Sequence, residues 1–167
     1  MAGKVLVAYG SWCGSTSEVA AEIAAVLRAA GLEVELRRAR DVRDVSLYAG
    51  AVIGTAIRAG HCTKEVLGLV RKHGKQLRQM PVAIFSVGLQ VKERTAQNEA
   101  KALQFLEPLR QELQPRAVGL FAGALDARKV GFPLSLIVRA LPQGDFRDWA
   151  AIRSWGRDVA RLMLAET

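Results

Sequence analysis

The sequence lacks several features that would define common protein classes. Its 167 residues include two cysteines, too few for a disulfide framework or a four-ligand zinc site of the usual kind. The two histidines and scattered carboxylates form no metal-ligand pattern, so we expect no metal. Aromatic residues make up only 6% of the chain and the cations are scattered, which argues against nucleic-acid binding.

Long apolar runs and targeting signals are also missing. Each apolar run is interrupted by charge before the ~18 residues that a membrane span requires. The first ten residues contain no charged segment followed by an apolar core and a cleavage site. We therefore expect a cytoplasmic protein, with room for peripheral contact at the inner face of the membrane.

The composition is that of a folded and basic protein. Half of the residues are hydrophobic and mean hydropathy is +0.12, which excludes a disordered polar chain. The length predicts a single domain over residues 1–167 that needs no covalent staple. The net charge of +8 indicates an anionic partner of some kind.

The chain alternates between short apolar segments and segments with helical periodicity. Five buried strands are predicted at residues 4–9, 32–36, 51–55, 81–85 and 117–122. Amphipathic helices are predicted between them, with a break near Pro108 and a last helix that starts near Asp148. This alternation predicts an α/β three-layer sandwich built on a parallel sheet.

In such folds the ligand lies beyond the carboxyl ends of the strands. The segment from Ser11 to Thr16 follows the first strand and carries three hydroxyls around Gly14, directly before a helix. Helix N–H groups and neutral hydroxyls make an anion site. The alternative is ordinary N-capping, for which Ser15 and Glu18 have capping-box spacing but which needs only one hydroxyl.

Other phosphate-binding classes do not fit the sequence. It contains neither the P-loop pattern nor G-x-G-x-x-G. A Cys-x5-Arg phosphatase loop would need arginine where Val19 stands. A phosphoacceptor receiver domain would need aspartate after the third strand, where Gly54 and Thr55 stand instead.

The string Ser-x-Cys-Gly-Ser-Thr resembles the flavodoxin phosphate loop, T/S-x-T-G-x-T, with Cys13 in place of a hydroxyl. More closely, the chain resembles the flavodoxin-type protoporphyrinogen dehydrogenase (quinone) family. The matching stretches are residues 52–61, 80–89 and 122–125 and the late Asp148-Trp149 pair. The resemblance implies a flavodoxin-like α/β/α sandwich with strand order 2-1-3-4-5 and a bound FMN.

The resemblance also implies which residues surround the flavin. The first loop would hold the FMN phosphate, and residues 55–60 and 86–89 would lie along the isoalloxazine ring. Neither ring-side loop carries Trp or Tyr, so Ile57, His61 and Leu89 are the candidates for contact with the ring. The expected FMN-binding residues are Ser11, Trp12, Cys13, Gly14, Ser15, Thr16, Thr55, Ala56, Ile57, Arg58, Ala59, Gly60, Ser86, Val87, Gly88 and Leu89.

Two residues are candidates for tuning the flavin. A cation at Arg58 near the ring would stabilise the anionic reduced flavin and raise its potential, and the alternative is a solvated loop arginine. His61 either faces the ligand or serves as a polar cap before the next helix. Cys13 and Cys62 fall at the same predicted sheet edge, as small packing residues or, less in keeping with a cytosolic protein, as a redox pair.

Residues 128–141 stand out as an apolar insertion with cations around it. Phe132, Leu134, Ile137, Val138 and Leu141 can form one face, with Arg128, Lys129 and Arg139 beside it. One interpretation is a short interfacial helix that contacts anionic lipid or admits a hydrophobic substrate. The other is a helix that packs on the domain.

The main functional hypothesis is a flavoenzyme that oxidises a tetrapyrrole such as protoporphyrinogen and passes electrons to a quinone. The second is an FMN electron carrier without its own substrate. A flavodoxin-like fold without flavin stays open because Cys13 departs from the motif. The loop from Ser11 to Thr16 holds no lysine or arginine, so the phosphate does not explain the basic charge.

Overall fold

The computed structural model describes residues 3–12, 14–126, 128, 131–141 and 143–167. Its core is a parallel sheet with the order β2-β1-β3-β5-β6. The five strands are β1 (Val5–Gly10), β2 (Val34–Arg38), β3 (Gly50–Arg58), β5 (Val82–Val87) and β6 (Ala117–Phe121). Counted along the chain, these strands follow the order 2-1-3-4-5, so the predicted flavodoxin-like α/β sandwich is confirmed.

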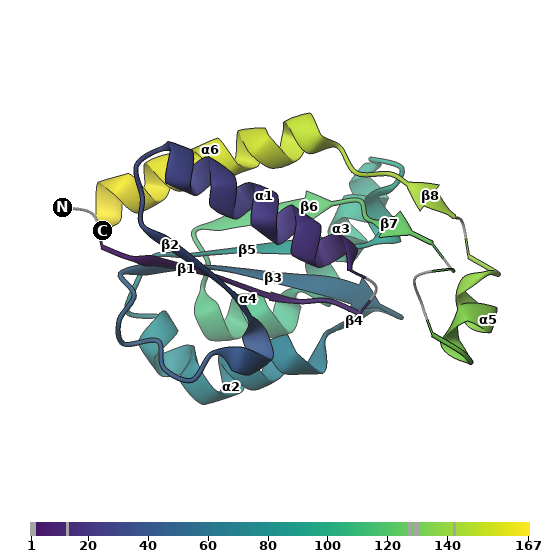
Figure 1. Cartoon of the computed structure of the whole chain (residues 1–167), viewed down its shortest axis with the longest axis horizontal. Coiled ribbons are helices and arrows are strands. Elements are labelled where there is room, and N and C mark those ends of the chain that lie inside the picture. The colour runs from purple at the N-terminus through teal and green to yellow at the C-terminus, as the bar shows by residue number, and fades with distance from the viewer. Residues whose placement is uncertain (1–2, 13, 127, 129–130, 142) are drawn as a thin grey trace.

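Helices cover both faces of the sheet (Figure 1). The helices are α1 (Ser15–Ala29), α2 (Lys64–Leu77), α3 (Ala96–Phe105), α4 (Glu107–Leu113), α5 (Leu134–Val138) and α6 (Trp149–Glu166). The α1 and α6 helices pack together on one face, and α2 and α4 pack together on the other. The predicted break near Pro108 lies at Leu106, which ends α3, and the proline enters the first turn of α4, where its missing N–H costs nothing.

Each face of the sheet has its own buried cluster, because alternate strand residues point to opposite sides. Leu6, Ile53 and Ile84 pack toward α2 and α4. Val7, Val52 and Phe85 pack toward α1 and α6, where Phe85 also meets a pair of rings from Phe121 and Trp155. Gly54 lies against the Phe85 ring, which occupies the space that a Cβ at position 54 would need.

A small second sheet lies beyond the main one. Strands β7 (Ala124–Leu125) and β8 (Gly144–Asp145) pair antiparallel, and α5 lies in the segment between them. In Figure 1 this segment stands past the carboxyl ends of the strands, opposite the two chain termini. Arg147 anchors it by pairing with Asp145 and with Glu18 of α1.

Two features of this end of the molecule were not predicted. The sequence gives no strand signal at residues 124–125 or 144–145, because two-residue strands carry no periodicity. Strand β3 also extends to Arg58 and turns back into β4 (His61–Cys62) as a hairpin. No helix in the described part of the chain has both the length and the apolarity that a membrane span demands.

Candidate functional site

A cavity of about 490 Å³ opens at the carboxyl ends of β1, β3, β5 and β6. Its lining comes from four chain segments that meet there and from the α5 region. The lining residues are Trp12, Ser15, Ala56, Ile57, Arg58, Ala59, Val87, Gly88, Leu89, Gln90, Gly123, Ala124, Leu125, Leu134, Ile137 and Leu141. The structure thus brings the three predicted loops together around one space. Most of this lining is apolar, which suits a flat organic ring.

The loop after β1 leads into α1 through a left-handed glycine. Gly14, with φ 95°, is the N-cap residue, and no side chain caps the helix. The capping box expected from Ser15 and Glu18 is therefore wrong, because Ser15 is already the first residue of the helix. The Gly14 amide donates instead to the Ser11 hydroxyl at 3.0 Å. Within the described part of the chain, no side chain caps the N-terminus of α1, and Cys13 lies outside that part.

Thr16 carries a second sign of an anion site. Its side chain is fully buried, yet its Oγ1 has no hydrogen-bond partner among the residues that the structure describes. A buried hydroxyl without a partner costs about 1–3 kcal/mol. The hydroxyl lies in the first turn of α1, where the helix dipole favours negative charge. An anion at this helix end would give the hydroxyl its missing acceptor.

The loop after β3 is a tight hairpin. Arg58 and His61 face each other across it, and Ala59 (φ 49°) and Gly60 (φ 79°) form the turn. Ala59 in this conformation is strained by roughly 1 kcal/mol. The turn holds the exposed side chain of Arg58 at the rim of the cavity, where Arg58 was predicted to lie near the ligand.

Trp12 supplies the aromatic surface that the two ring-side loops lack. It lies in the loop after β1, and the Arg58 guanidinium lies over its indole. Trp12 also packs against the buried Leu125, as do Leu89 and Leu134. The sequence placed Trp12 in the phosphate loop but gave no sign that its ring turns toward the cavity. Its orientation depends on the contact with Arg58, which lies 46 residues further along the chain.

The third loop begins inside β5. Ser86 and Val87 are the last buried residues of that strand, and the Gly88 amide donates to the Phe121 carbonyl at 3.0 Å. A Cβ on Gly88 would lie 3.3 Å from Ile57, so the glycine lets the second and third loops approach each other. Thr55 is buried in β3, where its hydroxyl accepts from the Thr63 amide and donates to the Ala56 carbonyl.

Several predicted residues do not line the cavity. Among the described residues expected to bind FMN, these are Ser11, Gly14, Thr16, Thr55, Gly60 and Ser86. His61 and Cys62 lie away from the lining as well. His61 is exposed and borders a different hollow, beside Phe105 and Pro108. It does not cap α2, because Thr63 holds that position and accepts from the Val66 amide. Cys62 is buried, its thiol donates to the Phe105 carbonyl, and burial raises the pKa of the thiol to about 11. The alternative of a redox pair with Cys13 involves a residue outside those described.

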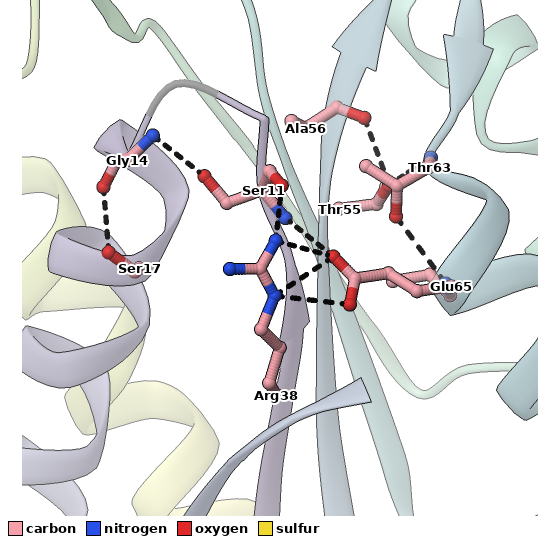
Figure 2. Close-up of polar contacts among 9 residues, drawn as sticks. Ser11, Gly14, Ser17, Arg38, Thr55, Ala56, Thr63 and Glu65 are labelled. Atoms are coloured by element: carbon pink, nitrogen blue, oxygen red, sulfur yellow. Dashed lines mark hydrogen bonds and ion pairs between the residues drawn. The ribbon is translucent and has the colours of Figure 1, made fainter. Parts of the chain in front are cut away.

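Two charged residues that contact the phosphate loop were not predicted from the sequence. Arg38, the last residue of β2, forms an ion pair with Glu65 in the first turn of α2 (Figure 2). Both side chains also contact the main chain of Ser11. The hydrogen bond with Glu65 holds the pKa of the Arg38 guanidinium above its ordinary value. Nothing in the local pattern distinguishes these residues from other charged residues at strand and helix ends.

The predicted apolar insertion forms one wall of the cavity. Leu134, Ile137 and Leu141 face the loops of the main sheet across the same space. Phe132 is 82% exposed and does not line the cavity. Arg128 and Arg139 are exposed nearby, whereas Lys129 and the side chain of Val138 lie outside what the structure describes.

The fold and this site define a flavodoxin-type protein, and the family model described as "Flavodoxin domain" matches residues 6–145. The chain belongs to this family, and a flavin cofactor follows from that membership. The chain is 27% identical to a protein of Escherichia coli strain K12 named protoporphyrinogen IX dehydrogenase [quinone], over 95% of this chain and 96% of that protein. A Leishmania major protein of the same name is 29% identical, over 97% of this chain and 77% of that protein.

The solved structures agree on the fold. A flavodoxin from Pseudomonas aeruginosa superposes with a TM-score of 0.60 at 19% identity, covering 96% of this chain and 99% of that one. At this identity the likeness establishes the shared architecture and nothing about substrate.

Proposed function

We propose that this protein is an FMN-dependent oxidoreductase that oxidises a tetrapyrrole of the protoporphyrinogen type and passes the electrons to a quinone. The relatives that carry this name match nearly the whole chain, which supports an oxidoreductase. The observation that carries the proposal is the second wall of the cavity, where Leu134, Ile137 and Leu141 stand opposite the flavin loops. A carrier that only docks to other redox proteins has no need of such a wall.

The residues present fit FMN. Ser11, Ser15 and Thr16, with the main-chain amides that open α1, would hold the phosphate, and the orphaned Thr16 hydroxyl supports this placement. The apolar part of the cavity would hold the ring, along residues 55–60 on one side and 86–89 on the other. When bound, FMN supplies the capacity to accept two electrons and pass them on.

The protein's own residues contribute orientation, charge and exclusion of water. Arg58 places a cation at the rim of the cavity, where it would stabilise negative charge on a ligand. Trp12 offers an apolar face on which a planar ring can rest. The α5 wall would cover a planar apolar substrate and keep water from the reacting atoms.

An anaerobic turnover assay tests the proposal. Purified protein loaded with FMN is mixed with protoporphyrinogen and a soluble quinone, and porphyrin fluorescence is followed. We expect fluorescence to rise without any added redox protein. Leu134→Asp should lower this rate while leaving the flavin spectrum intact, and Leu164→Asp, on the exposed side of α6, should not. Turnover only in the presence of a partner protein would favour the carrier instead.

The second proposal is peripheral membrane contact through residues 128–141. Four of the six large hydrophobic side chains that are exposed in the described structure lie here: Phe132, Leu136, Ile137 and Leu141. The α5 segment that carries them lies past the carboxyl ends of the sheet strands (Figure 1). The same segment contains the exposed cations Arg128 and Arg139. Apolar side chains with flanking cations suit an anionic lipid surface, from which a quinone would also arrive.

Co-sedimentation with vesicles tests this contact. We expect binding to vesicles that contain phosphatidylglycerol at low salt and much weaker binding to phosphatidylcholine alone. Phe132→Asp and Leu136→Asp should reduce binding, since neither side chain lines the cavity and both are exposed. Leu47→Asp is the matched control, because Leu47 is exposed as well and lies outside residues 128–141. Absence of binding at low salt would reject the membrane contact.

A further inference from the structure

The first residue of the phosphate loop is held on both sides of its backbone by one ion pair. The Ser11 amide donates to Glu65 Oε1 at 3.2 Å, and the Ser11 carbonyl accepts from Arg38 Nη2 at 2.7 Å. Arg38 in turn donates to both Glu65 oxygens, at 3.0 to 3.3 Å. Figure 2 shows the guanidinium lying between the carboxylate and the loop.

The ion pair joins three elements that are far apart in the sequence. Arg38 ends β2, Ser11 follows β1, and Glu65 lies in the first turn of α2. Gly10 allows the helix to come this close, because a Cβ there would meet the side chains of Thr63, Val66 and Glu65. The pair is well shielded, with the Glu65 side chain 14% and the Arg38 side chain 31% exposed.

The same turn of α2 also reaches the ring-side loop. Thr63, the N-cap residue, donates its amide to the Thr55 hydroxyl at 3.0 Å, and Thr55 lies just before the residues that line the cavity. The start of α2 therefore contacts both the phosphate loop and the base of the loop after β3.

We propose that Arg38 and Glu65 are positioning residues that hold the phosphate loop in its anion-binding shape before any ligand arrives. This inference rests on the proposed FMN site. The phosphate loop has no cation of its own, so its affinity depends on amides and hydroxyls that must already point the right way. A loop fixed in advance loses less conformational entropy on binding, and affinity rises accordingly.

Binding measurements with two flavins test the proposal. FMN and riboflavin share the ring, and only FMN has a phosphate. For Arg38→Met we expect the dissociation constant of FMN to rise about 10-fold or more, while that of riboflavin changes less than about 2-fold. Glu65→Gln should give an intermediate loss, because the amide oxygen still accepts from Ser11 but cannot match the guanidinium fork.

Arg37→Met is the matched control. Arg37 precedes Arg38 on the same strand, carries the same charge and pairs with Glu35 instead. A long-range charge effect would weaken FMN equally in both variants, and that result would overturn the proposed positioning role. Weaker binding of both flavins by a variant that is still folded would overturn it as well. Circular dichroism of each variant shows whether it is folded, and Glu65→Gln serves if Arg38→Met is not.

Amide exchange measured by NMR separates this inference from the proposed function. In protein without flavin, the Ser11 amide should exchange at least about 10-fold faster in Arg38→Met than in Arg37→Met. If the wild type binds no flavin, the proposed function fails, and the exchange rate of the Ser11 amide alone tests whether Arg38 and Glu65 hold the loop. An unchanged exchange rate of Ser11 would overturn this positioning role whether or not FMN binds.

Discussion

The Arg58 guanidinium lies over the indole ring of Trp12, with its Cζ atom 4.8 Å from the ring centroid. The two residues come from different loops, and both line the cavity. The contact fixes the direction of the arginine at the rim of the site. It thereby turns a loop arginine, of a kind that is usually solvated, into a charge with a defined position.

The first prediction concerns the potential of the flavin. Arg58→Ala should lower the two-electron potential by on the order of 20 mV, because the reduced anion loses a nearby cation that solvent partly screens. Arg58→Lys should keep most of the wild-type value. Redox titration of the three proteins measures this effect. An unshifted potential in Arg58→Ala would show that Arg58 does not stabilise the reduced flavin.

The second prediction concerns the ring side of the site. Trp12→Ala should weaken FMN and riboflavin alike, by roughly 10-fold, since it removes an apolar face and the contact with Arg58. Trp12→Phe should restore most of the affinity. Fluorescence titration with both flavins gives the two constants. A loss confined to FMN would mean that Trp12 acts on the phosphate rather than on the ring.

The third prediction compares two fully buried threonines. Thr16→Val should leave the flavin-free protein as stable as the wild type or about 1 kcal/mol more stable, because it removes a hydroxyl without a partner. The same change should weaken FMN binding. Thr55→Val should destabilise the protein by about 1–2 kcal/mol, because the Thr63 amide loses its acceptor.

Urea unfolding of the flavin-free proteins measures both threonine variants. Equal destabilisation by the two substitutions would show that the Thr16 hydroxyl has a partner in solution and is not held in reserve for a ligand.

The fourth prediction follows from the buried thiol of Cys62. Its pKa of about 11 in the folded protein lies above the value for an exposed thiol, so the folded state retains the proton that the unfolded state releases. Stability from this group is therefore fully present below pH 8 and declines as pH rises from about 9 to 11.

Between pH 8 and pH 10 we expect the wild type to lose about 1 kcal/mol more than Cys62→Ala. Denaturant unfolding at the two pH values checks this difference. Parallel loss in both proteins would place the alkaline sensitivity elsewhere. Burial also raises the pKa of Tyr48, to about 12, so its ionisation should affect the free energy of unfolding only at higher pH.

The sequence was sufficient where one local rule decides the structure. Apolar runs located the five main strands, and periodicity located the helices, including the start of α6 at its cap residue Asp148. The end of β3 was missed because its last residues pair with a strand only two residues long. The cap at Ser15 was wrong because Gly14 can take a left-handed conformation that local spacing does not reveal.

The site shows the same division. The sequence predicted the three loops, and the structure brings them together around one cavity. The ring of Trp12 and the pair of Arg38 with Glu65 were missed because each depends on a contact across at least 27 residues. Such contacts depend on the packing of whole elements, and no pattern within a short window carries them.

The paired ends of the α5 segment have a consequence for how such proteins diverge. Because Ala124 lies opposite Asp145 and Leu125 opposite Gly144, the two ends of the insertion lie side by side. Changes in its length or sequence then destabilise the rest of the fold little, since the entropic cost of closing a loop grows slowly with its length. Natural selection can remodel one wall of the cavity while the opposite wall, built into the sheet, stays the same. Relatives that share the phosphate loop would accordingly be expected to differ most between these two short strands.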